Sequence, residues 1–438
     1  IQTDILMQMT ESNGDMITIP IPYDTDTTPL TVPPGNFKAL IAPRNGNGNF
    51  SRSEENILRE ALASPIGTPS LQELARGRQR VTLVTSDHTR NMPSRKTLPI
   101  LLKEIRTGNP EAEITILIAT GLHRPTTVEE QRQMFGDEIV DRERILVNDA
   151  FCAEDFVSIG TLPSGASCLI HKAAAEADLL VTEGFIEPHF FAGFSGGRKS
   201  ILPGISAAET INENHCFDAI AHPRSAAGVL AGNPIHEDMV AAARLAKVAF
   251  IFNVTLDHSK RISGAFAGEL EAAHQAGVAF LTRELRCDAV QGDIVVTSNG
   301  GYPLDQNLYQ SPKAVATAEK CAGEDGVIIM FASCRDGIGG EHFEQVMRWG
   351  TPREMERRMA AIPPRETVPE MWCAQVYARV LKNHPVILVS DYPDDENIRA
   401  MNLIPAKSGQ EALEKAFQIK GNDASVVVIP DGVCTLIV

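Results

Sequence analysis

The chain has 438 residues, of which 43% are hydrophobic and 22% charged, and its formal net charge at pH 7 is −16. This composition is that of a folded, water-soluble protein, and the length exceeds the roughly 250 to 300 residues at which one hydrophobic core stops growing. The negative charge opposes binding to nucleic acid phosphates, and no segment approaches the roughly 18 apolar residues of a membrane span, so we expect no nucleic acid, no membrane and a cytoplasmic location.

Short apolar runs rich in β-branched residues recur along the chain and predict strands that are buried on both faces. They cover residues 81–85, 114–118, 179–182, 248–254, 294–297, 327–331, 386–389 and 426–429. Helical patterns separate many of them, over residues 98–106, 234–245, 269–285, 314–322, 369–381 and 410–419. This alternation predicts an α/β fold with mostly parallel sheets.

The length predicts two α/β domains, although no proline-rich or charged linker marks the boundary. We place it near Arg286, which gives an N-terminal domain over 1–286 with nearly all the candidate chemistry and a C-terminal domain over 287–438. Several polar motifs directly follow predicted strands, where ligands bind in open α/β sheets. We therefore expect the active site in a cleft between the two domains.

The densest motif runs from Glu187 to Gly204 and contains Gly193, Gly196 and Gly197 before Lys199. Closely spaced glycines let the backbone approach a ligand, and their N–H groups can hold an anion. Lys199 would then be a phosphate contact or a nucleophile. A glycine-rich turn with a surface lysine is the alternative, and the motif does not satisfy the P-loop pattern.

Three histidines stand out as candidates for proton transfer or metal binding. His123 follows a predicted strand, His189 lies in the glycine-rich motif, and His215 lies in a predicted helix that begins near Ser206. The first two could be general bases, because imidazole titrates near neutral pH, and His215 could bind a metal. Each could equally be a structural histidine. The carboxylates near His215 in the sequence do not complete a recognisable metal site.

Two polar groups could bind an anionic substrate. Asp87 and Arg90 follow a predicted strand, and Arg90 could hold a carboxylate through two parallel hydrogen bonds while Asp87 orients a hydroxyl. A helix cap with a surface arginine is the alternative. Tyr309, Gln310 and Lys313 form the second group, for which a plain helix N-terminus near Pro312 is the alternative.

Taken together, these motifs resemble the signature series of the nickel-dependent lactate racemases, a family of 2-hydroxyacid racemases and epimerases. The matching positions, in order, are Asp87-x-x-Arg90, Gly121-Leu122-His123-Arg124, Pro188-His189, Gly193 to Lys199, Asn214-His215 and Gln310-x-x-Lys313. Order and spacing agree without a departure at these positions, and several separated motifs are more specific than any one of them.

The resemblance implies a nickel-pincer nucleotide cofactor, a pyridinium-3-thioamide-5-thiocarboxylic acid mononucleotide bound covalently to Lys199. The cofactor would supply three nickel ligands and His215 the fourth. His123 and His189 would be the two catalytic bases. Arg90, Lys313, Gln310 and Tyr309 would bind the substrate. The resemblance also implies cofactor contacts for Asp87, Ser195, Gly196 and Gly197, and Asp87 could instead support the histidines.

The resemblance further implies a racemase or epimerase of lactate or a related 2-hydroxy acid, working by proton-coupled hydride transfer through a transient 2-oxo acid. Separate biosynthetic proteins would have to make the cofactor. The substrate stays open between lactate and a larger acid such as a sugar acid, with Phe190, Phe191 and Trp372 as candidate pocket walls. The sequence also leaves open a cofactor-less binding protein of the same fold and a zinc hydrolase, although no H-E-x-x-H motif supports the hydrolase.

Overall fold

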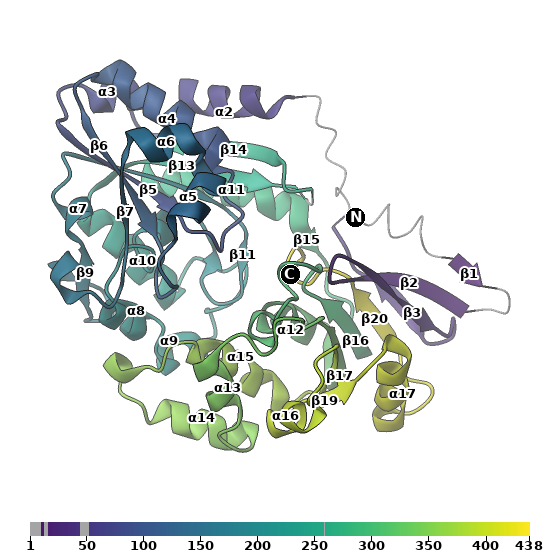
Figure 1. The fold of residues 1–438 in the computed structure, drawn as a ribbon. Helices are drawn as coiled ribbons and strands as arrows, with labels where there is room; N and C mark the ends of the chain where they lie inside the picture. Colours follow the sequence, from purple (N-terminus) through teal and green to yellow (C-terminus); the bar gives the residue numbers. More distant parts are fainter. Residues whose placement is uncertain (1–9, 13–15, 44–51, 258) are drawn as a thin grey trace.

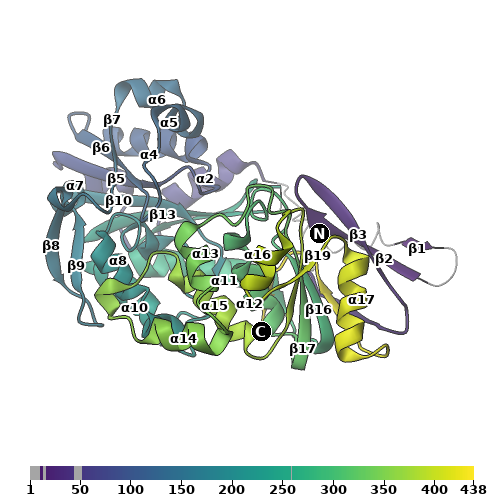
Figure 2. The same cartoon turned by 60° about the horizontal axis from the view of Figure 1, so that its bottom comes forward.

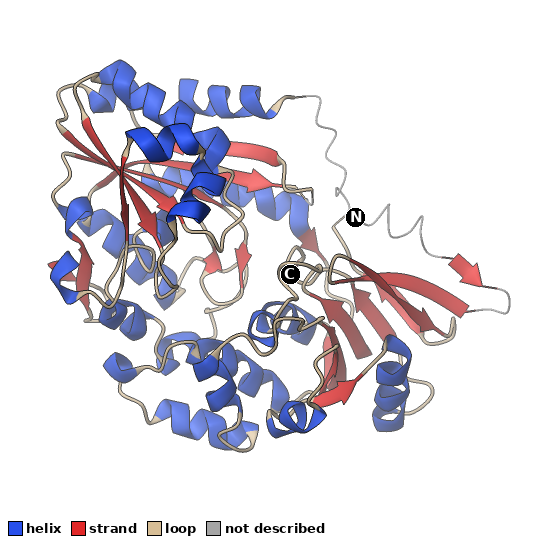
Figure 3. Cartoon of the chain, in the orientation of Figure 1, coloured by secondary structure: helices blue, strands red, loops and turns tan. Residues whose placement is uncertain are grey.

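The structure, a computed structural model, describes residues 10–12, 16–43, 52–257 and 259–438. Within these ranges the chain forms two six-stranded sheets, each with helices packed against it (Figures 1 and 3). No helix in the described part is long and apolar enough to cross a membrane. The mixed α/β fold with mostly parallel sheets is as the sequence predicts.

The first sheet has the strand order β14-β13-β10-β5-β6-β7 and is parallel except at β14, which pairs antiparallel with β13. Its strands are β5 (Arg80–Ser86), β6 (Glu113–Ala119), β7 (Arg144–Val147), β10 (Leu179–Phe185), β13 (Val248–Leu256) and β14 (Ile262–Gly268). Every residue of β10 is buried. Strands β5, β10 and β13 are therefore central strands of a sheet covered on both faces, as their apolar sequences predict.

Helices cover both faces of this sheet (Figure 1). The helices of this half of the chain are α2 (Glu54–Ala63), α3 (Leu71–Ala75), α4 (Ser94–Gly108), α5 (Val128–Phe135), α6 (Asp137–Arg142), α7 (Lys172–Ala175), α8 (Ala208–Asn214), α9 (Phe217–Ala221), α10 (Pro234–Leu245) and α11 (Leu270–Leu285). Alternate strand residues point into different cores: Leu83 packs in the cluster that contains α2 and α4, and Val84 in the cluster that contains α10. Smaller pieces complete this half: η1 (Ala153–Asp155), β8 (Phe156–Thr161), β9 (Ser167–His171), β11 (Pro188–His189), β12 (Gly193–Phe194) and η2 (Gly197–Ser200).

The second sheet is parallel throughout, with the order β19-β18-β17-β16-β20-β4. Its strands are β4 (Phe37–Leu40), β16 (Gly292–Ser298), β17 (Ala322–Phe331), β18 (Val386–Val389), β19 (Ile404–Ala406) and β20 (Val426–Ile429). The accompanying elements are β15 (Arg286–Cys287), η3 (Leu308–Gln310), α12 (Pro312–Glu319), α13 (Glu341–Met347), α14 (Pro352–Ala360), η4 (Pro364–Glu366), α15 (Met371–Leu381), α16 (Asp395–Ala400), α17 (Gly409–Lys420) and β21 (Leu436–Ile437).

An N-terminal segment belongs to this second half, which the sequence did not lead us to expect. Strand β4 pairs with β20 at the sheet edge. The antiparallel ribbon of β1 (Thr10–Ser12), β2 (Met16–Tyr23) and β3 (Asp26–Val32) lies beside the second sheet, as Figures 1 and 2 show. Ile19 and Leu30 are fully buried in a core with Val296 of β16 and Leu413 of α17. The division near Arg286 stays a prediction.

The two halves also share contacts of their own. One hydrophobic cluster contains Ile211 of α8 and Ile220 of α9 together with Trp372 and Val376 of α15. The amide of Gln375 donates to the carbonyl of Phe217 at 2.8 Å, and Arg365 Nε donates to Glu213 Oε1 at 2.8 Å. Helices α8 and α9, with the residues that follow them, are therefore held against the second half.

Most expected elements occur with small shifts in their ends. Strands β18 and β20 and helix α10 have the expected bounds. The helix expected over 314–322 begins at Pro312 and ends at Glu319, and Ala322 already starts β17. The helix expected from Ser206 begins at Ala208, and His215 is the first residue after it.

Candidate functional site

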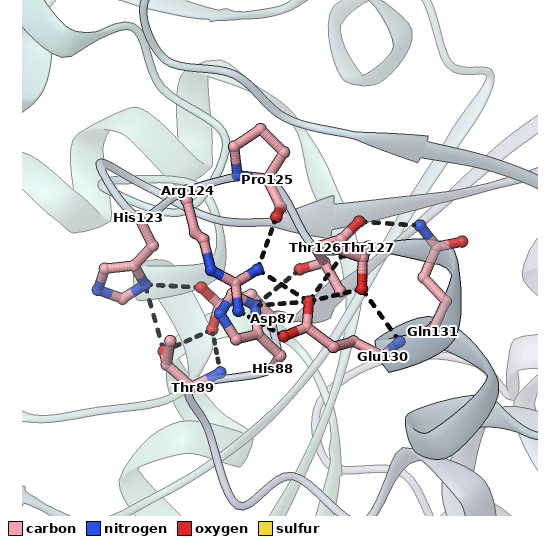
Figure 4. A network of polar contacts seen from close by, with 10 residues as sticks. All are labelled: Asp87, His88, Thr89, His123, Arg124, Pro125, Thr126, Thr127, Glu130 and Gln131. Carbon is pink, nitrogen blue, oxygen red and sulfur yellow. Dashed lines mark hydrogen bonds and ion pairs between the residues drawn. The ribbon is translucent and has the colours of Figure 1, made fainter.

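His123 and Asp87 form a hydrogen-bonded pair beside the ends of β6 and β5 (Figure 4). The Nδ1 atom of His123 lies 2.6 Å from Asp87 Oδ2. Thr89 donates to the other carboxylate oxygen through its hydroxyl and its N–H, at 2.7 and 3.1 Å. Burial of Asp87 would raise its pKa, but the hydrogen bond and charge of His123, with Arg90, outweigh it, and the pKa lies below the ordinary 3.8. An ionised carboxylate only accepts, so Nδ1 of His123 donates and Nε2 is free to take a proton.

A second polar contact fixes the loop that carries His123. Arg124 donates to both oxygens of Glu130 in α5, at 2.9 and 2.5 Å, as Figure 4 shows. Its guanidinium and the Thr127 N–H lower the pKa of Glu130 to about 2. Thr127 and Glu130 also form a capping box at the start of α5. The loop after β6 is therefore tied to the first turn of α5.

The glycine-rich segment is shaped by close packing. Gly196 has a φ of +78°, and a Cβ atom there would lie 2.7 Å from Asn253 Oδ1; Gly197 has a φ of +52°, and its Cβ would lie 3.0 Å from His274. Asn253 also accepts the Gly197 N–H at 2.7 Å. Ser195 donates from its hydroxyl to the Phe185 carbonyl at 2.8 Å. The contacts of these three residues with a cofactor stay predictions; their contacts within the fold are structural.

Arg198 holds this segment from inside the protein. Its side chain is 1% exposed, and its guanidinium donates to the carbonyls of Ala192, Ser195 and Gly196 at 2.8, 3.3 and 3.2 Å. No carboxylate forms an ion pair with it among the described residues, and burial lowers its pKa to about 9. Arg198 therefore clamps the backbone just before Lys199.

Lys199 lies in η2, with its Nζ atom 5.9 Å from the centre of the Phe191 ring. Burial, followed by the charges of Arg198 and Arg90, holds the pKa of Lys199 well below its ordinary 10.5, although Glu187 opposes this shift. A lysine with a lowered pKa is neutral more often at a given pH than an ordinary lysine is. The environment of Lys199 is that of a nucleophile rather than of a surface lysine.

His189 lies in β11 and stacks on Phe190, with ring centres 5.0 Å apart. Its Nδ1 atom accepts the Ala192 N–H at 3.3 Å. Burial and then the charges of Lys199 and Lys313 hold the pKa of His189 well below 6.5, so the ring is neutral. A neutral imidazole that accepts at Nδ1 carries its proton on Nε2. At Nε2, His189 is therefore a hydrogen-bond donor, whereas the Nε2 atom of His123 is an acceptor.

His215 is enclosed by two aromatic rings from different halves of the chain. It makes edge contacts with Phe191 at 5.1 Å and with Trp372 of α15 at 5.0 Å, and it is 4% exposed. Its Nδ1 atom is buried and has no hydrogen-bond partner among the described residues. Burial and the charge of Lys199 lower the pKa of His215 to about 3. The ring is neutral, which is the state in which imidazole binds a metal.

The second half contributes Lys313, near the start of α12, and Tyr309 and Gln310, in η3. Burial lowers the pKa of Lys313, with Glu187 and Arg90 as its main charged neighbours. Burial, then the charges of Cys373 and Glu370, raise the pKa of Tyr309 well above 10, and the Tyr309 ring packs edge-on against Phe343. Tyr309 is therefore a neutral hydroxyl.

The structure thus gathers most of the expected residues around one charged centre. The charges of Arg90, Lys199 and Lys313 all act on His189, and the neutral His215 also lies near it, so residues of both halves meet there. Asp87 and His123 lie beside this centre, because the charge of Arg90 also lowers the pKa of Asp87. This concentration of positive charge in an acidic chain fits an anionic ligand. No three His, Cys, Asp or Glu side chains of the described residues converge as a metal site.

Sequence reasoning missed several residues that shape the site. Glu187 and Arg198 stand inside the glycine-rich motif, but nothing in the motif assigns them a role, and Asn253 has no local signal because its partner is 56 positions away. The sequence predicts Asp87 mainly as a cofactor or hydroxyl contact; the structure pairs it with His123, and its contact with a cofactor stays a prediction.

Two protein-family profiles match the chain: the lactate racemase N-terminal domain over residues 23–228 and the lactate racemase C-terminal domain over 287–438. The lactate racemase of Thermoanaerobacterium thermosaccharolyticum is 47% identical over 426 residues, covering 96% of this chain and 99% of its own length. The lactate racemase of Lactiplantibacillus plantarum is 45% identical over 423 residues, covering 96% and 100%.

Solved structures agree with this match. The lactate racemase apoprotein from T. thermosaccharolyticum superposes with a TM-score of 0.93 at 47% identity, covering 96% of this chain and all of that one. A Thermotoga maritima protein at 17% identity has a TM-score of 0.64, over 88% of this chain and 98% of its own, and shows the fold alone. On the family profiles and on identity over nearly its whole length, the chain belongs to the lactate racemase family.

Proposed function

We propose that this protein is an isomerase that interconverts the two enantiomers of lactate. The observation that carries the proposal is the pair His123 and His189, one able to accept a proton at Nε2 and the other presenting an N–H there. Racemisation through a planar 2-oxo acid needs a proton taken from the hydroxyl group and a proton returned to the carbonyl oxygen. Full-length similarity to two lactate racemases supports lactate as the substrate.

The described residues fit a nickel-pincer nucleotide. His215 is neutral, and its Nδ1 atom is buried and has no hydrogen-bond partner among the described residues. Such a nitrogen is available to bind a metal. Lys199 has a pKa that burial holds well below its ordinary 10.5, which suits an amine that forms a covalent bond with the cofactor. Arg90, Arg198 and Lys313 together carry more positive charge than one substrate carboxylate needs, which favours a second anionic group such as a phosphate. Ser195, Gly196 and Gly197 would approach that group.

Binding of the substrate would use residues from both halves, in a cleft between them. The Arg90 guanidinium and the Lys313 ammonium would hold the carboxylate, with Gln310 and the neutral Tyr309 hydroxyl as hydrogen-bond partners. Phe191 and Trp372, which enclose His215, would form apolar walls near the methyl group. Anchoring the carboxylate keeps C2 in place while its substituents change.

The protons would move as follows. His123 takes the hydroxyl proton at Nε2 while Asp87 stabilises the imidazolium that forms. When bound, the cofactor would accept the C2 hydrogen as hydride and return it. His189, on the other side, would donate a hydrogen bond from its Nε2–H to the oxygen of the 2-oxo acid, and the proton held on His123 would return to that oxygen. For the opposite enantiomer His189 would be the base, in the tautomer that carries its own proton on Nδ1 and leaves Nε2 free.

A larger 2-hydroxy acid, such as a sugar acid, is the second candidate substrate. The family resemblance covers epimerases of such acids, and only the walls of the pocket would differ. Neither a zinc hydrolase nor a cofactor-less binding protein accounts for two histidines with complementary protonation beside a lysine whose pKa is held well below its ordinary value.

The test is chiral analysis of D- and L-lactate with protein produced together with the cofactor-making proteins. We expect both enantiomers to reach an equal mixture, and His123→Gln and His189→Gln each to lower kcat by about a hundredfold or more. A panel of longer 2-hydroxy acids separates the two candidate substrates. Conversion of a sugar acid without conversion of lactate would contradict the proposal, as would unchanged kcat in both variants.

A further inference from the structure

Glu183, in the central strand β10, is a fully buried carboxyl group without a cationic partner. It is 0% exposed, and no Lys, Arg or His lies within ion-pair distance of it in the described part of the chain. Burying a carboxyl group is costly unless hydrogen bonds compensate for the lost water. Burial raises the pKa of Glu183, and the bonds from Ser94, Thr85 and Thr97 act against this rise. The role of a carboxyl group here must therefore lie in the hydrogen bonds that it accepts.

Three hydroxyl groups converge on it. Thr85 and Ser94 donate to Glu183 Oε1 at 2.5 and 2.6 Å, and Thr97 donates to Oε2 at 2.6 Å. All three side chains are fully buried. Thr85 lies near the end of β5, and Ser94 and Thr97 lie in the first turn of α4. One side chain therefore joins three elements.

These contacts lie at both ends of the loop over 87–93, which carries Asp87 and Arg90. Strand β5 ends one residue before Asp87, and α4 begins one residue after Pro93. Pro93 provides no side-chain cap for α4. Because Thr182 pairs with Val84 in the sheet, the next residues along, Glu183 and Thr85, lie side by side. The loop is thus anchored at its start and its end to one carboxyl group.

Glu183 also reaches the other active-site segment through its backbone. Ser200, the residue after Lys199, donates from its hydroxyl to the Glu183 carbonyl at 3.3 Å. The loop with Arg90 and the segment with Lys199 therefore share one rigid strand as their reference. Such fixed support is what keeps a site within the small tolerance that catalysis demands.

We propose that Glu183 is a positioning residue that sets Arg90 and the Asp87–His123 pair against the substrate by fixing both ends of the 87–93 loop. This role rests on the proposed lactate racemisation. Its structural part, the anchoring of the loop, does not depend on any substrate.

The test replaces two of the donating threonines by valine, which removes their hydroxyl groups and keeps the side-chain volume. In the double variant Thr85→Val and Thr97→Val, we expect KM for lactate to rise about tenfold, because Arg90 is no longer held in place. Amide hydrogen exchange over 87–93 should become faster, while exchange over 193–200 stays as in the wild type. Thr182→Val is the matched control: it lies next to Glu183 in β10, and its buried hydroxyl has no partner among the described residues. It should change neither KM nor exchange.

Glu183→Gln is the conservative variant. Its amide oxygen can accept from Thr85 and Ser94, and its NH₂ can donate to Thr97, whose hydroxyl can still donate to the Pro93 carbonyl, now 3.4 Å away. We expect KM within about threefold of the wild type. Wild-type KM and exchange in the double variant would overturn the proposal, and so would exchange that accelerates equally over 193–200. Exchange needs no turnover, so a wild type inactive on lactate would contradict the proposed function alone.

Discussion

The histidines show how neighbouring groups decide the chemistry of identical side chains. Asp87 fixes the proton of His123 on Nδ1, and the Ala192 N–H fixes the proton of His189 on Nε2. Because the pKa of Asp87 lies below 3.8, its pairing with His123 persists above that pH and weakens as the pH falls through the lowered value. The sequence supplies the histidines and their positions, but their complementary protonation depends on partners that only the fold brings near.

At the same scale, the lowered pKa of Lys199 gives a prediction for the cofactor-free protein. Only the neutral form of an amine reacts, and because burial holds the pKa of Lys199 well below 10.5, a larger fraction of Lys199 than of an ordinary lysine is neutral at pH 7. We expect a small acylating reagent at pH 7 to modify Lys199 ahead of the exposed Lys103, as measured by peptide mass spectrometry. Preferential modification of Lys103 would contradict the lowered pKa.

Among the elements, the glycine-rich segment is the most tightly constrained part of the site. Gly196 combines a positive φ with a Cβ position 2.7 Å from Asn253 Oδ1, whereas Gly165 has a positive φ of +91° and open space around it. Gly165→Ala should therefore lose only the backbone term, about 1 kcal/mol of unfolding free energy, and Gly196→Ala should lose about 1 to 3 kcal/mol more. Chemical denaturation measures both. Equal losses would mean that packing against Asn253 does not constrain the segment.

The elements also show what the sequence can and cannot predict. Strands such as β10 and β20 are predictable because continuous apolar runs suit a buried parallel sheet. The β2–β3 ribbon escapes prediction because Pro20, Pro22 and Pro29 interrupt its pattern, and prolines argue against a strand. The pairing of β4 with β20 cannot be predicted from the sequence, because two strands almost 400 positions apart leave no local signal of their contact. Resemblance identifies the site motifs, but it does not identify Glu183 and Asn253 or the supporting role of Arg198 within its motif.

For the whole molecule, the fold ties its N-terminal segment to its C-terminal half. The β2–β3 ribbon and β4 cover the core of the second sheet and the edge of β20. A fragment of residues 287–438 would expose that core and that edge, and exposed strand edges promote aggregation. We expect the fragment to be insoluble alone and to become soluble when residues 16–43 are co-produced, as measured by size-exclusion chromatography. A monomeric, folded fragment would contradict this.

The central claim is that both halves build one site around a cofactor carried by Lys199. Intact-mass spectrometry with nickel analysis tests it most directly, on wild type and Lys199→Ala protein produced together with the cofactor-making proteins. We expect a mass increment and one nickel per chain in the wild type and neither in the variant. A wild type without increment or nickel, despite competent cofactor synthesis, would contradict it.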